Sequence, residues 1–225
     1  MNTAPRGAVA PPRTFFTSDT HFGHRLMTLL RGHAPGVTVK DDVTLEQISE
    51  HDEHIIASWN SVVARDDTVW HLGDLTLKRS EEIAGILQRL NGRLRIVLGN
   101  HDRAHPRFGE RSIEEQKELL EAGIEYVCTE ARITIAGNGT NRWPILLSHF
   151  PYMHDNEETG RLSKFTQWLP RDTGEVLLHG HTHAAERSQP GRPRQIHVGW
   201  DAWGRPVAEE ELRHVAVLGA RDRSR

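Results

Sequence analysis

Three histidines alternate in the stretch LLHGHTHAA, which spans residues 177–185. Alternate side chains of an extended strand lie on one face, so His179, His181 and His183 could present their imidazoles to one small volume. An imidazole can attack phosphorus as a nucleophile, or it can bind a metal ion. The spacing therefore allows covalent phosphoryl transfer, a zinc site, or ligands shared between two metal ions, and the other polar motifs have to separate these alternatives.

Candidate metal ligands follow each of five short apolar runs. The runs are residues 13–17, 67–72, 94–98, 143–147 and 175–178, and the motifs that follow them are Asp19-Thr20-His21, Gly73-Asp74, Gly99-Asn100-His101-Asp102, Ser148-His149 and the opening stretch. Chance alone gives about one Asp-x-His and about one Gly-Asp in a chain of this length, but only about 0.08 of a Gly-His-x-His and about 0.002 of a Gly-Asn-His-Asp. Ligands of open α/β sheets bind at the carboxyl ends of the strands, so we expect the motifs to meet at one edge.

The elements that must position these motifs follow from the hydrophobic pattern. The apolar runs are too short for helices and are predicted to be strands. Helices are expected over residues 44–63, where Thr44 and Gln47 have capping-box spacing, and over 80–92 and 112–123. Residues 126–149 have the pattern of successive strands with a hairpin loop at 137–141. The alternation predicts an α/β fold with a largely parallel sheet, and the extra strands predict a second sheet packed on it.

The length of the chain favours one domain. At 225 residues it can bury one substantial core, which we place at residues 13–219. Residues 1–12 are expected to form a disordered arm and residues 220–225 a mobile basic tail. The long polar connection 151–173 is expected to be functional or mobile.

Composition limits the classes of partner. The 28 Lys and Arg residues against 31 Asp and Glu give a formal net charge of -3, which predicts neither a strong nucleic-acid binder nor a polyanion mimic. The fifteen histidines gather in short motifs, which indicates metal binding. Cys128 is the only cysteine, consistent with a reducing compartment. No pattern of a signal peptide or membrane span is visible, so we predict a cytoplasmic protein without a membrane partner.

The order of the motifs resembles that of the calcineurin-like metallophosphoesterases, in which DTH, GD, GNHD, SH and GHTH follow one another. The resemblance covers roughly residues 14–208, and the strings FFTSDTHFGH, DTVWHLGD and HVGWDAWGRPV are similar to a branch of small stand-alone enzymes in bacteria and phages, whose substrate is generally unassigned. It implies an α/β fold of the four-layer α-β-β-α type, with two packed mixed sheets flanked by helices.

The resemblance also implies the metal ligands. Asp19, His21 and His183 would hold one ion, Asn100, His149 and His181 would hold the second, and Asp74 would bridge both. Imidazole and carboxylate ligands suit Mn²⁺, which we favour, and also Fe, Zn or Ni. Two divalent ions keep a net positive charge beside two carboxylates and a hydroxide, so the centre would attract an anionic phosphoester.

The expected reaction is in-line attack on phosphorus by a metal-bound hydroxide, with no covalent intermediate. His101 is expected to protonate the leaving oxygen, and Asp102 to orient the His101 ring. His24 could contact the substrate or belong to a helix N-terminal turn, and Arg103 could bind substrate oxygens or be solvated. The substrate is expected to be a small phosphoester or a nucleic-acid-derived phosphodiester, and a diester is favoured over a monoester because no dedicated phosphomonoester clamp is visible. The sequence leaves the oligomeric state open.

Three rival functions remain to be weighed. A histidine-triad nucleotide hydrolase has apolar residues where Gly180 and Thr182 stand, and it leaves GNHD and DTH unexplained. A metallo-β-lactamase-type zinc site requires an Asp-His pair that the chain lacks after His183. A catalytically idle scaffold would use the same metal site for structure or partner binding.

Several other polar residues need no catalytic role. His71 lies in an expected core strand, where a buried, hydrogen-bonded histidine is the better interpretation. His179 is expected at a strand end outside the ligand set. Asp201, in GWDAWG, is either a turn residue or part of the pocket.

Overall fold

The computed structural model describes residues 11–136, 142–153, 165–189 and 191–212. Residues 1–10 of the arm expected over 1–12, the hairpin loop at 137–141, the tail at 220–225 and residues 154–164 of the long connection lie outside the described residues. Among the helices that the structure describes, none is long and apolar enough to cross a bilayer.

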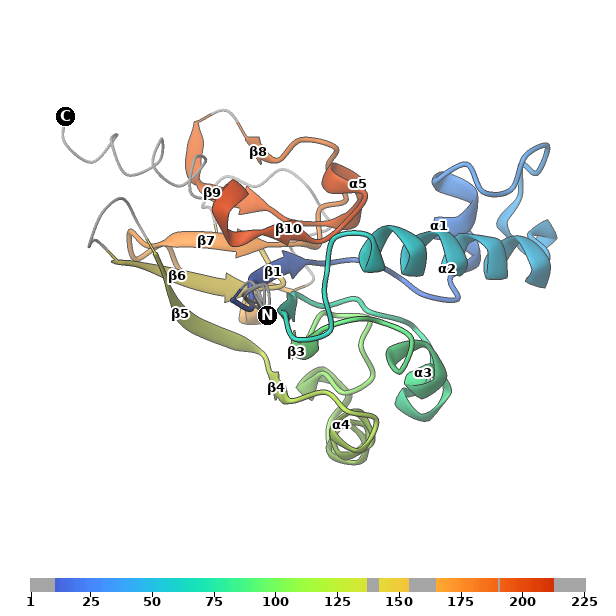
Figure 1. The fold of residues 1–225 in the computed structure, drawn as a ribbon, viewed down its shortest axis with the longest axis horizontal. Coiled ribbons are helices and arrows are strands. Elements are labelled where there is room, and N and C mark those ends of the chain that lie inside the picture. The colour runs from blue at the N-terminus through green and yellow to red at the C-terminus, as the bar shows by residue number, and fades with distance from the viewer. Residues whose placement is uncertain (1–10, 137–141, 154–164, 190, 213–225) are drawn as a thin grey trace, which may run out of the picture.

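Two five-stranded mixed sheets form the centre of the molecule (Figure 1). The first has the order β10-β1-β2-β3-β4, in which β1 to β4 are parallel and β10 pairs antiparallel with β1. Its strands are β1 (Thr14–Thr17), β2 (Thr68–His71), β3 (Arg93–Val97), β4 (Tyr126–Cys128) and β10 (Val207–Ala208).

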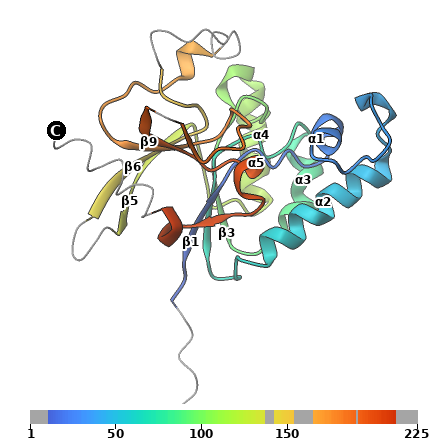
Figure 2. The ribbon, with the colours of Figure 1, turned by 90° about the horizontal axis from the view of Figure 1, so that it is seen from above.

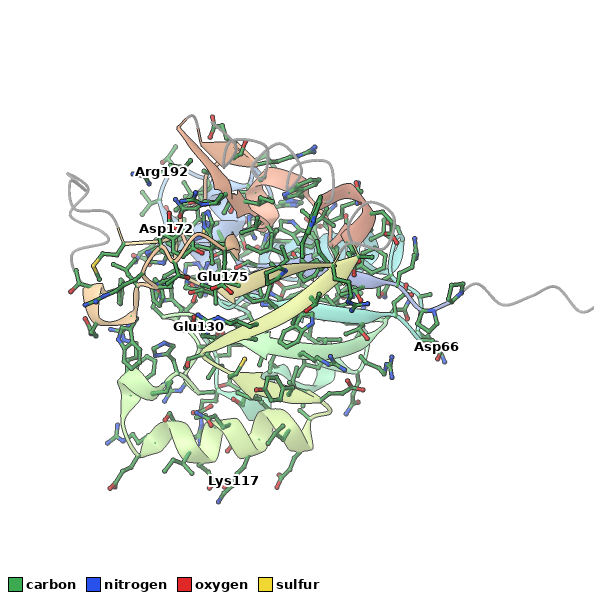
Figure 3. All side chains as sticks on the ribbon, turned by 90° about the vertical axis from the view of Figure 1, so that its left-hand side faces the viewer. Asp66, Lys117, Glu130, Asp172, Glu175 and Arg192 are labelled. Carbon is green, nitrogen blue, oxygen red and sulfur yellow. The ribbon has the colours of Figure 1, made fainter. Side chains whose placement is uncertain are left out.

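The second sheet has the order β5-β6-β7-β9-β8, in which β6, β7 and β9 are parallel and the two outer strands are antiparallel to their neighbours. Its strands are β5 (Glu130–Ala136), β6 (Arg142–Ser148), β7 (Val176–His179), β8 (Ser188–Gln189) and β9 (Arg192–His197). Figure 3 labels charged side chains of this sheet, with Glu130 at the start of β5 and Asp172 and Glu175 in the segment that leads into β7.

Helices cover the first sheet on the side away from the second (Figure 2). They are α2 (Leu45–Asn60), α3 (Ser80–Leu87) and α4 (Arg111–Glu121). The shorter elements are α1 (Arg25–Leu30), α5 (Trp200–Trp203) and the 3₁₀ turns η1 (Lys40–Asp42), η2 (Pro106–Phe108) and η4 (Thr166–Trp168). The expected arrangement of two mixed sheets flanked by helices is confirmed.

Alternation along the strands builds two hydrophobic cores. In β1, Phe15 belongs to the core under the helices with Trp59 of α2, and its neighbour Phe16 belongs to the core between the sheets with Ile145 and Leu178. Successive side chains of a strand point to opposite faces, so a strand covered on both sides is apolar throughout. This explains why the strand sequences form continuous apolar runs.

Most expected elements are present, with shifted ends. The Thr44 and Gln47 capping box starts α2 as predicted. The helix expected over 80–92 stops at Leu87, and Asn91 beyond it bonds to α2: its backbone amide donates to Asn60 and its carbonyl accepts from the indole of Trp59. Helix α1 begins after His24, where a helix N-terminal turn is one of the two interpretations of that residue, but its extent is not predicted. Its six residues are too short to show a helical hydrophobic period.

Candidate metal centre

The five motifs converge at one end of the two sheets. A cavity of about 530 Å³ opens there, and six of the residues expected to act in catalysis or metal binding line it: His21, Asp74, Asn100, His101, His181 and His183. Asp19 and His149 are fully buried next to this lining. The packing of the two sheets therefore brings together candidate ligands as distant in sequence as Asp19 and His183.

One group of ligand atoms comes from Asp19, His21 and His183. The Nε2 atoms of His21 and His183 lie 3.2 Å apart, and Nε2 of His183 lies 3.8 Å from Oδ1 of Asp19. One ligand atom of each residue lies within 4.8 Å of the others. Atoms that bind one ion at about 2.1 Å lie roughly 3 to 3.4 Å apart, so the spacing suits a single cation.

A second group comes from Asn100, His149 and His181. Nε2 of His149 lies 3.2 Å from Oδ1 of Asn100 and 3.2 Å from Nδ1 of His181. Nδ1 of His149 lies 2.8 Å from the carbonyl oxygen of Leu72, which fixes the ring with Nε2 toward the cavity. This is the arrangement of a metal-binding imidazole, whose other nitrogen is held by a carbonyl.

Asp74 lies between the two groups. Its Oδ2 is 3.7 Å from Nε2 of His21 and 3.6 Å from Nε2 of His149. Its Oδ1 accepts a hydrogen bond of 2.8 Å from the backbone amide of His101. One carboxylate oxygen is therefore fixed by the backbone, and the other faces both sets of imidazoles.

Backbone conformation marks the same residues. Among the described residues, five that are not glycine have a positive φ, from 53° to 69°: Asp19, His21, Asp74, His181 and His183. Such conformations cost free energy and persist where the surrounding structure enforces them, which occurs mainly at functional sites. All five belong to the expected ligand set, and the sequence alone does not reveal their positive φ angles.

Glycines allow the ligand loops to approach each other. Gly180, which stands between the candidate ligand His181 and the strand before it, does not have a positive φ. A Cβ there would instead collide with Ser18 Oγ and Asp19 Oδ2. A Cβ on Gly99 would likewise collide with Oδ1 of Asp74. The close contact arises between separate strands and is invisible along the chain.

Burial shifts the pKa values of the candidate ligands, so that the charged forms of the carboxylates and imidazoles are disfavoured in the absence of a metal ion. The pKa of Asp74 is raised well above its ordinary value by burial and by the charges of Asp102 and Asp19. Burial also raises the pKa of Asp19 and lowers the pKa of His149 well below its ordinary value. Neutral imidazoles beside crowded carboxylates form a donor set that suits divalent metal ions.

Asp102 does not orient the His101 ring, which corrects the expectation. Its Oδ2 accepts hydrogen bonds from the amides of Gly99 and Asp74 at 2.7 and 2.8 Å, and its Oδ1 accepts from the amide of Leu75 at 2.9 Å. Burial raises its pKa to about 6 even though these amides favour the charged form. The loops after β2 and β3 turn their amides toward this carboxylate, so Asp102 holds the loop that carries Asp74.

His101 reaches the cavity without belonging to either group of ligand atoms. The residue is exposed, lines the cavity, and places its ring edge-on to His21 with centroids 5.7 Å apart. Its contact with Asp74 is made by the backbone amide. The side chain is thus beside the expected metal ligands and open to a bound substrate.

Asp201 lines the cavity and holds the ring of the candidate metal ligand His183. Its Oδ2 lies 2.7 Å from Nδ1 of His183. Arg31 donates to both Asp201 oxygens, at 2.9 and 3.1 Å, and to the carbonyl oxygens of Asp19 and Thr20. Although burial raises the Asp201 pKa, the hydrogen bonds from His183 and Arg31 outweigh it and hold that pKa below its ordinary value.

The two expected substrate contacts have different outcomes. His24 lines the cavity and also caps α1, because its Nδ1 accepts a hydrogen bond from the amide of Met27 at 3.1 Å. Arg103 does not line the cavity: its Nε donates to Glu115 at 3.0 Å. The arginine at the cavity is instead Arg107, which donates to the carbonyl of Asn100 at 2.8 Å.

His71 and His179 are buried structural residues, as the strand pattern indicated. Nε2 of His71 lies 3.0 Å from the hydroxyl of Thr20, and burial lowers its pKa to about 3. The His179 ring packs against that of His197 with centroids 5.5 Å apart, and burial lowers its pKa to about 3 as well. Neither residue lines the cavity.

A second cavity of about 540 Å³ lies where the two sheets meet, between β4 and β5, with Glu130 (labelled in Figure 3) on its lining. Its charged residues are engaged in ion pairs, Arg95 with Glu125 at 3.3 Å and Arg132 with Glu130 at 3.6 Å. This cavity therefore offers paired charges, whereas the first offers two clusters of metal-ligating atoms.

Comparison with known proteins points to one family. Residues 14–220 match the family described as the Calcineurin-like phosphoesterase superfamily domain. The gene 66 protein of Mycobacterium phage L5 is 40% identical over 205 residues, which cover 88% of this chain and 91% of the phage protein. The gene 66 protein of Mycobacterium phage D29 is 38% identical over 205 residues, covering 89% and 94%. A solved structure, the protein of unknown function AQ665 from Aquifex aeolicus, is similar with a TM-score of 0.55 and 25% identity, over 91% of this chain and 100% of that one.

Proposed function

Because the chain belongs to the calcineurin-like phosphoesterase superfamily, we propose that it is a phosphodiesterase with a dinuclear metal centre. The observation that carries the proposal is the place of Asp74, whose Oδ2 lies 3.7 Å from His21 and 3.6 Å from His149. A carboxylate that lies between two clusters of metal-ligating side chains is the natural bridge between two cations.

The residues present fit two divalent ions, with Mn²⁺ favoured. Asp19, His21 and His183 would hold one ion, Asn100, His149 and His181 the other, and Asp74 both. Bound metal ions lower the pKa of water and neutralise the charge of a phosphoryl group. The chain contributes a fixed and buried donor set, which keeps that charge close to the substrate.

The chain's own acid would be His101. Its side chain faces the cavity, while its backbone amide holds Asp74. A protonated imidazole there would donate its proton to the leaving oxygen as the ester bond breaks, so an alcohol leaves rather than an alkoxide. His24, which also lines the cavity, would contact a phosphoryl oxygen.

The cavity favours a diester over a monoester. Among the described residues that line it, Arg107 is the only arginine or lysine, and its guanidinium already donates to the carbonyl of Asn100 at 2.8 Å. A phosphomonoester carries nearly two negative charges near neutral pH, and a diester carries one. Phosphomonoesterase activity at the same centre is the alternative.

The proposal is tested by turnover of bis-p-nitrophenyl phosphate and p-nitrophenyl phosphate with Mn²⁺-loaded protein. We expect faster turnover of the diester, loss of activity with a chelator, and recovery on adding Mn²⁺ back. Asp74→Ala should lose both metals and activity, whereas Asp172→Ala, at an exposed acid paired with Arg194, should retain them. Folded, metal-loaded protein that hydrolyses neither ester would contradict the proposal and favour an idle scaffold.

A further inference from the structure

The cavity extends past the metal ligands onto an aliphatic wall. Leu26, Met27 and Leu30, all from α1, line it together with the candidate centre. Met27 is buried at the base of this side of α1, whereas Leu26 is 38% exposed and Leu30 is 67% exposed, so two of the three side chains are open to the cavity. Apolar side chains left open inside a ligand cavity are a common basis of binding, since covering them releases water. We define these three residues as the α1 wall.

The α1 wall is tied firmly to the metal centre. At the start of the helix, the His24 ring accepts from the Met27 amide and lies 5.4 Å, centroid to centroid, from the ring of His21. Arg31 at the end of the helix donates to the carbonyl of Asp19 at 2.7 Å. The wall therefore keeps a fixed distance from any phosphate held at the centre, which avoids an ordering cost on binding.

An aromatic side chain, Phe165, also lines the cavity. The Phe165 ring lies 5.6 Å from that of His181, and the guanidinium of Arg107 sits 5.1 Å from the Phe165 centroid. His24, which precedes the α1 wall and caps its helix, lies beside His21, and Phe165 lies beside His181, so apolar side chains line the cavity near both ligand groups. A phosphate at the centre would thus have apolar side chains near it.

We propose that the α1 wall binds the ring of a ring-bearing ester group of the substrate, as in a nucleoside phosphodiester. This inference rests on the proposed function, since the phosphate at the centre sets where the ester group falls. A cavity of about 530 Å³ is large for a phosphate group alone and matches organic ligands.

The wall also has the length of a ring. From residue 26 to residue 30 the helix rises about 6 Å, which matches a ring system and is too short to cover a long acyl chain. Its aliphatic side chains have no polar groups for the edge of a base, so the wall would bind the face of the ring without selecting one base.

The experiment is titration calorimetry of Mn²⁺-loaded protein with four phosphate monoesters that differ only in the organic group: ethyl, hexyl, phenyl and thymidine 5′-phosphate. We expect phenyl phosphate and thymidine 5′-phosphate to bind about tenfold more tightly than ethyl phosphate, the effect of covering one face of a ring. Hexyl phosphate should gain less, because a flexible chain loses entropy when it is ordered. Comparing the phenyl and thymidine arms separates a general aryl site from a nucleoside site.

Variants assign the effect to the wall. The double variant Leu26→Ser/Leu30→Ser should lose the advantage of the ring-bearing esters over ethyl phosphate. Ile113→Ser provides the matched control, because Ile113 is a 58% exposed apolar residue on α4 that does not line the cavity. Equal affinity for all four esters, tighter binding of hexyl than of phenyl phosphate, or an advantage that survives in the double variant would overturn the inference.

The outcome is separable from that of the proposed function. Binding is measured at equilibrium, so it does not need turnover. Ring-dependent binding without hydrolysis of either bis-p-nitrophenyl phosphate or p-nitrophenyl phosphate would refute the hydrolase and leave the ring site. Hydrolysis without ring-dependent binding would refute the ring site and leave the hydrolase.

Discussion

The Asp201 carboxylate lies 2.7 Å from Nδ1 of His183, while Nε2 of the same ring points toward His21 at 3.2 Å. Burial lowers the pKa of His183, but the bond to Asp201 and the charge of Asp19 outweigh it, so the net pKa is raised. The carboxylate thereby selects the tautomer with the proton on Nδ1 and leaves Nε2 free to bind a cation. Sequence alone left Asp201 between a turn residue and a pocket residue, and this contact decides for the pocket.

Asp201→Asn should weaken metal binding at one group of ligands. We expect about a 10- to 100-fold loss of Mn²⁺ affinity at the group containing His183, the usual effect of removing the partner of a ligand histidine. The group formed by Asn100, His149 and His181 should keep its affinity. Calorimetric titration with Mn²⁺, together with the metal content after dialysis, distinguishes the binding of the first ion from the binding of the second. Asp172→Asn is the control, and an equal loss at both steps would argue against a local effect.

His101→Ala should separate metal binding from chemistry. The side chain contributes to neither group of ligand atoms, and the backbone amide that holds Asp74 survives the substitution. We therefore expect full metal content and a drop in kcat of about 10²- to 10⁴-fold, the range of general acid catalysis. His54→Ala, at an exposed position of α2, should keep wild-type activity. Near-full turnover of His101→Ala would remove this residue from the mechanism.

Gly180→Ala should damage the site through a single methyl group. The new Cβ would collide with Ser18 and with Oδ2 of Asp19, so a metal ligand has to move. We expect a loss of about 1 to 3 kcal/mol in the free energy of unfolding, together with weaker Mn²⁺ binding. Gly85→Ala tests the same change inside α3, where nothing lies within 4 Å, and it should be neutral or stabilising. Similar losses in the two variants would contradict this explanation.

His71→Gln should reduce the dependence of stability on pH. Burial lowers the His71 pKa from 6.5 to about 3, so the folded state binds fewer protons than the unfolded state between these values. The contribution is present above the unfolded pKa and is lost as pH falls toward the folded pKa, which amounts to about 2 kcal/mol between pH 7 and pH 5. Gln can keep a hydrogen bond to Thr20 but does not titrate. Urea unfolding of metal-free protein at both pH values should show a smaller acid loss in the variant, and an unchanged loss would refute the assignment.

The strands and their polar ends were predictable because the evidence for them is local. An apolar run followed by GNHD or GHTH combines a buried strand with ligand types, and both can be recognised within ten residues. The Thr44 and Gln47 cap was predictable for the same reason, since its hydrogen bonds join positions three apart.

The errors concern contacts between distant segments. Asp102 was assigned to its neighbour His101, but its oxygens bond to the amides of Asp74 and Leu75 on another loop. Arg103 is predicted to contact the substrate because it is close to the GNHD motif in sequence. In the structure its guanidinium donates to Glu115 of α4. Short spacing in sequence does not decide which of several nearby donors or acceptors a charged side chain will meet.

The sequence by itself determined the family, the two-sheet α/β fold and the set of residue types from which a metal centre can be built. Periodicity is a property of single segments and motif order is a property of the linear chain, so both can be recognised without coordinates. Only the tertiary structure decided that Asp74 lies between two imidazole groups, that five candidate ligands have positive φ, and that Arg31 links Asp201 to Asp19. These relationships depend on how closely separate strands pack, and packing is a property of the whole chain.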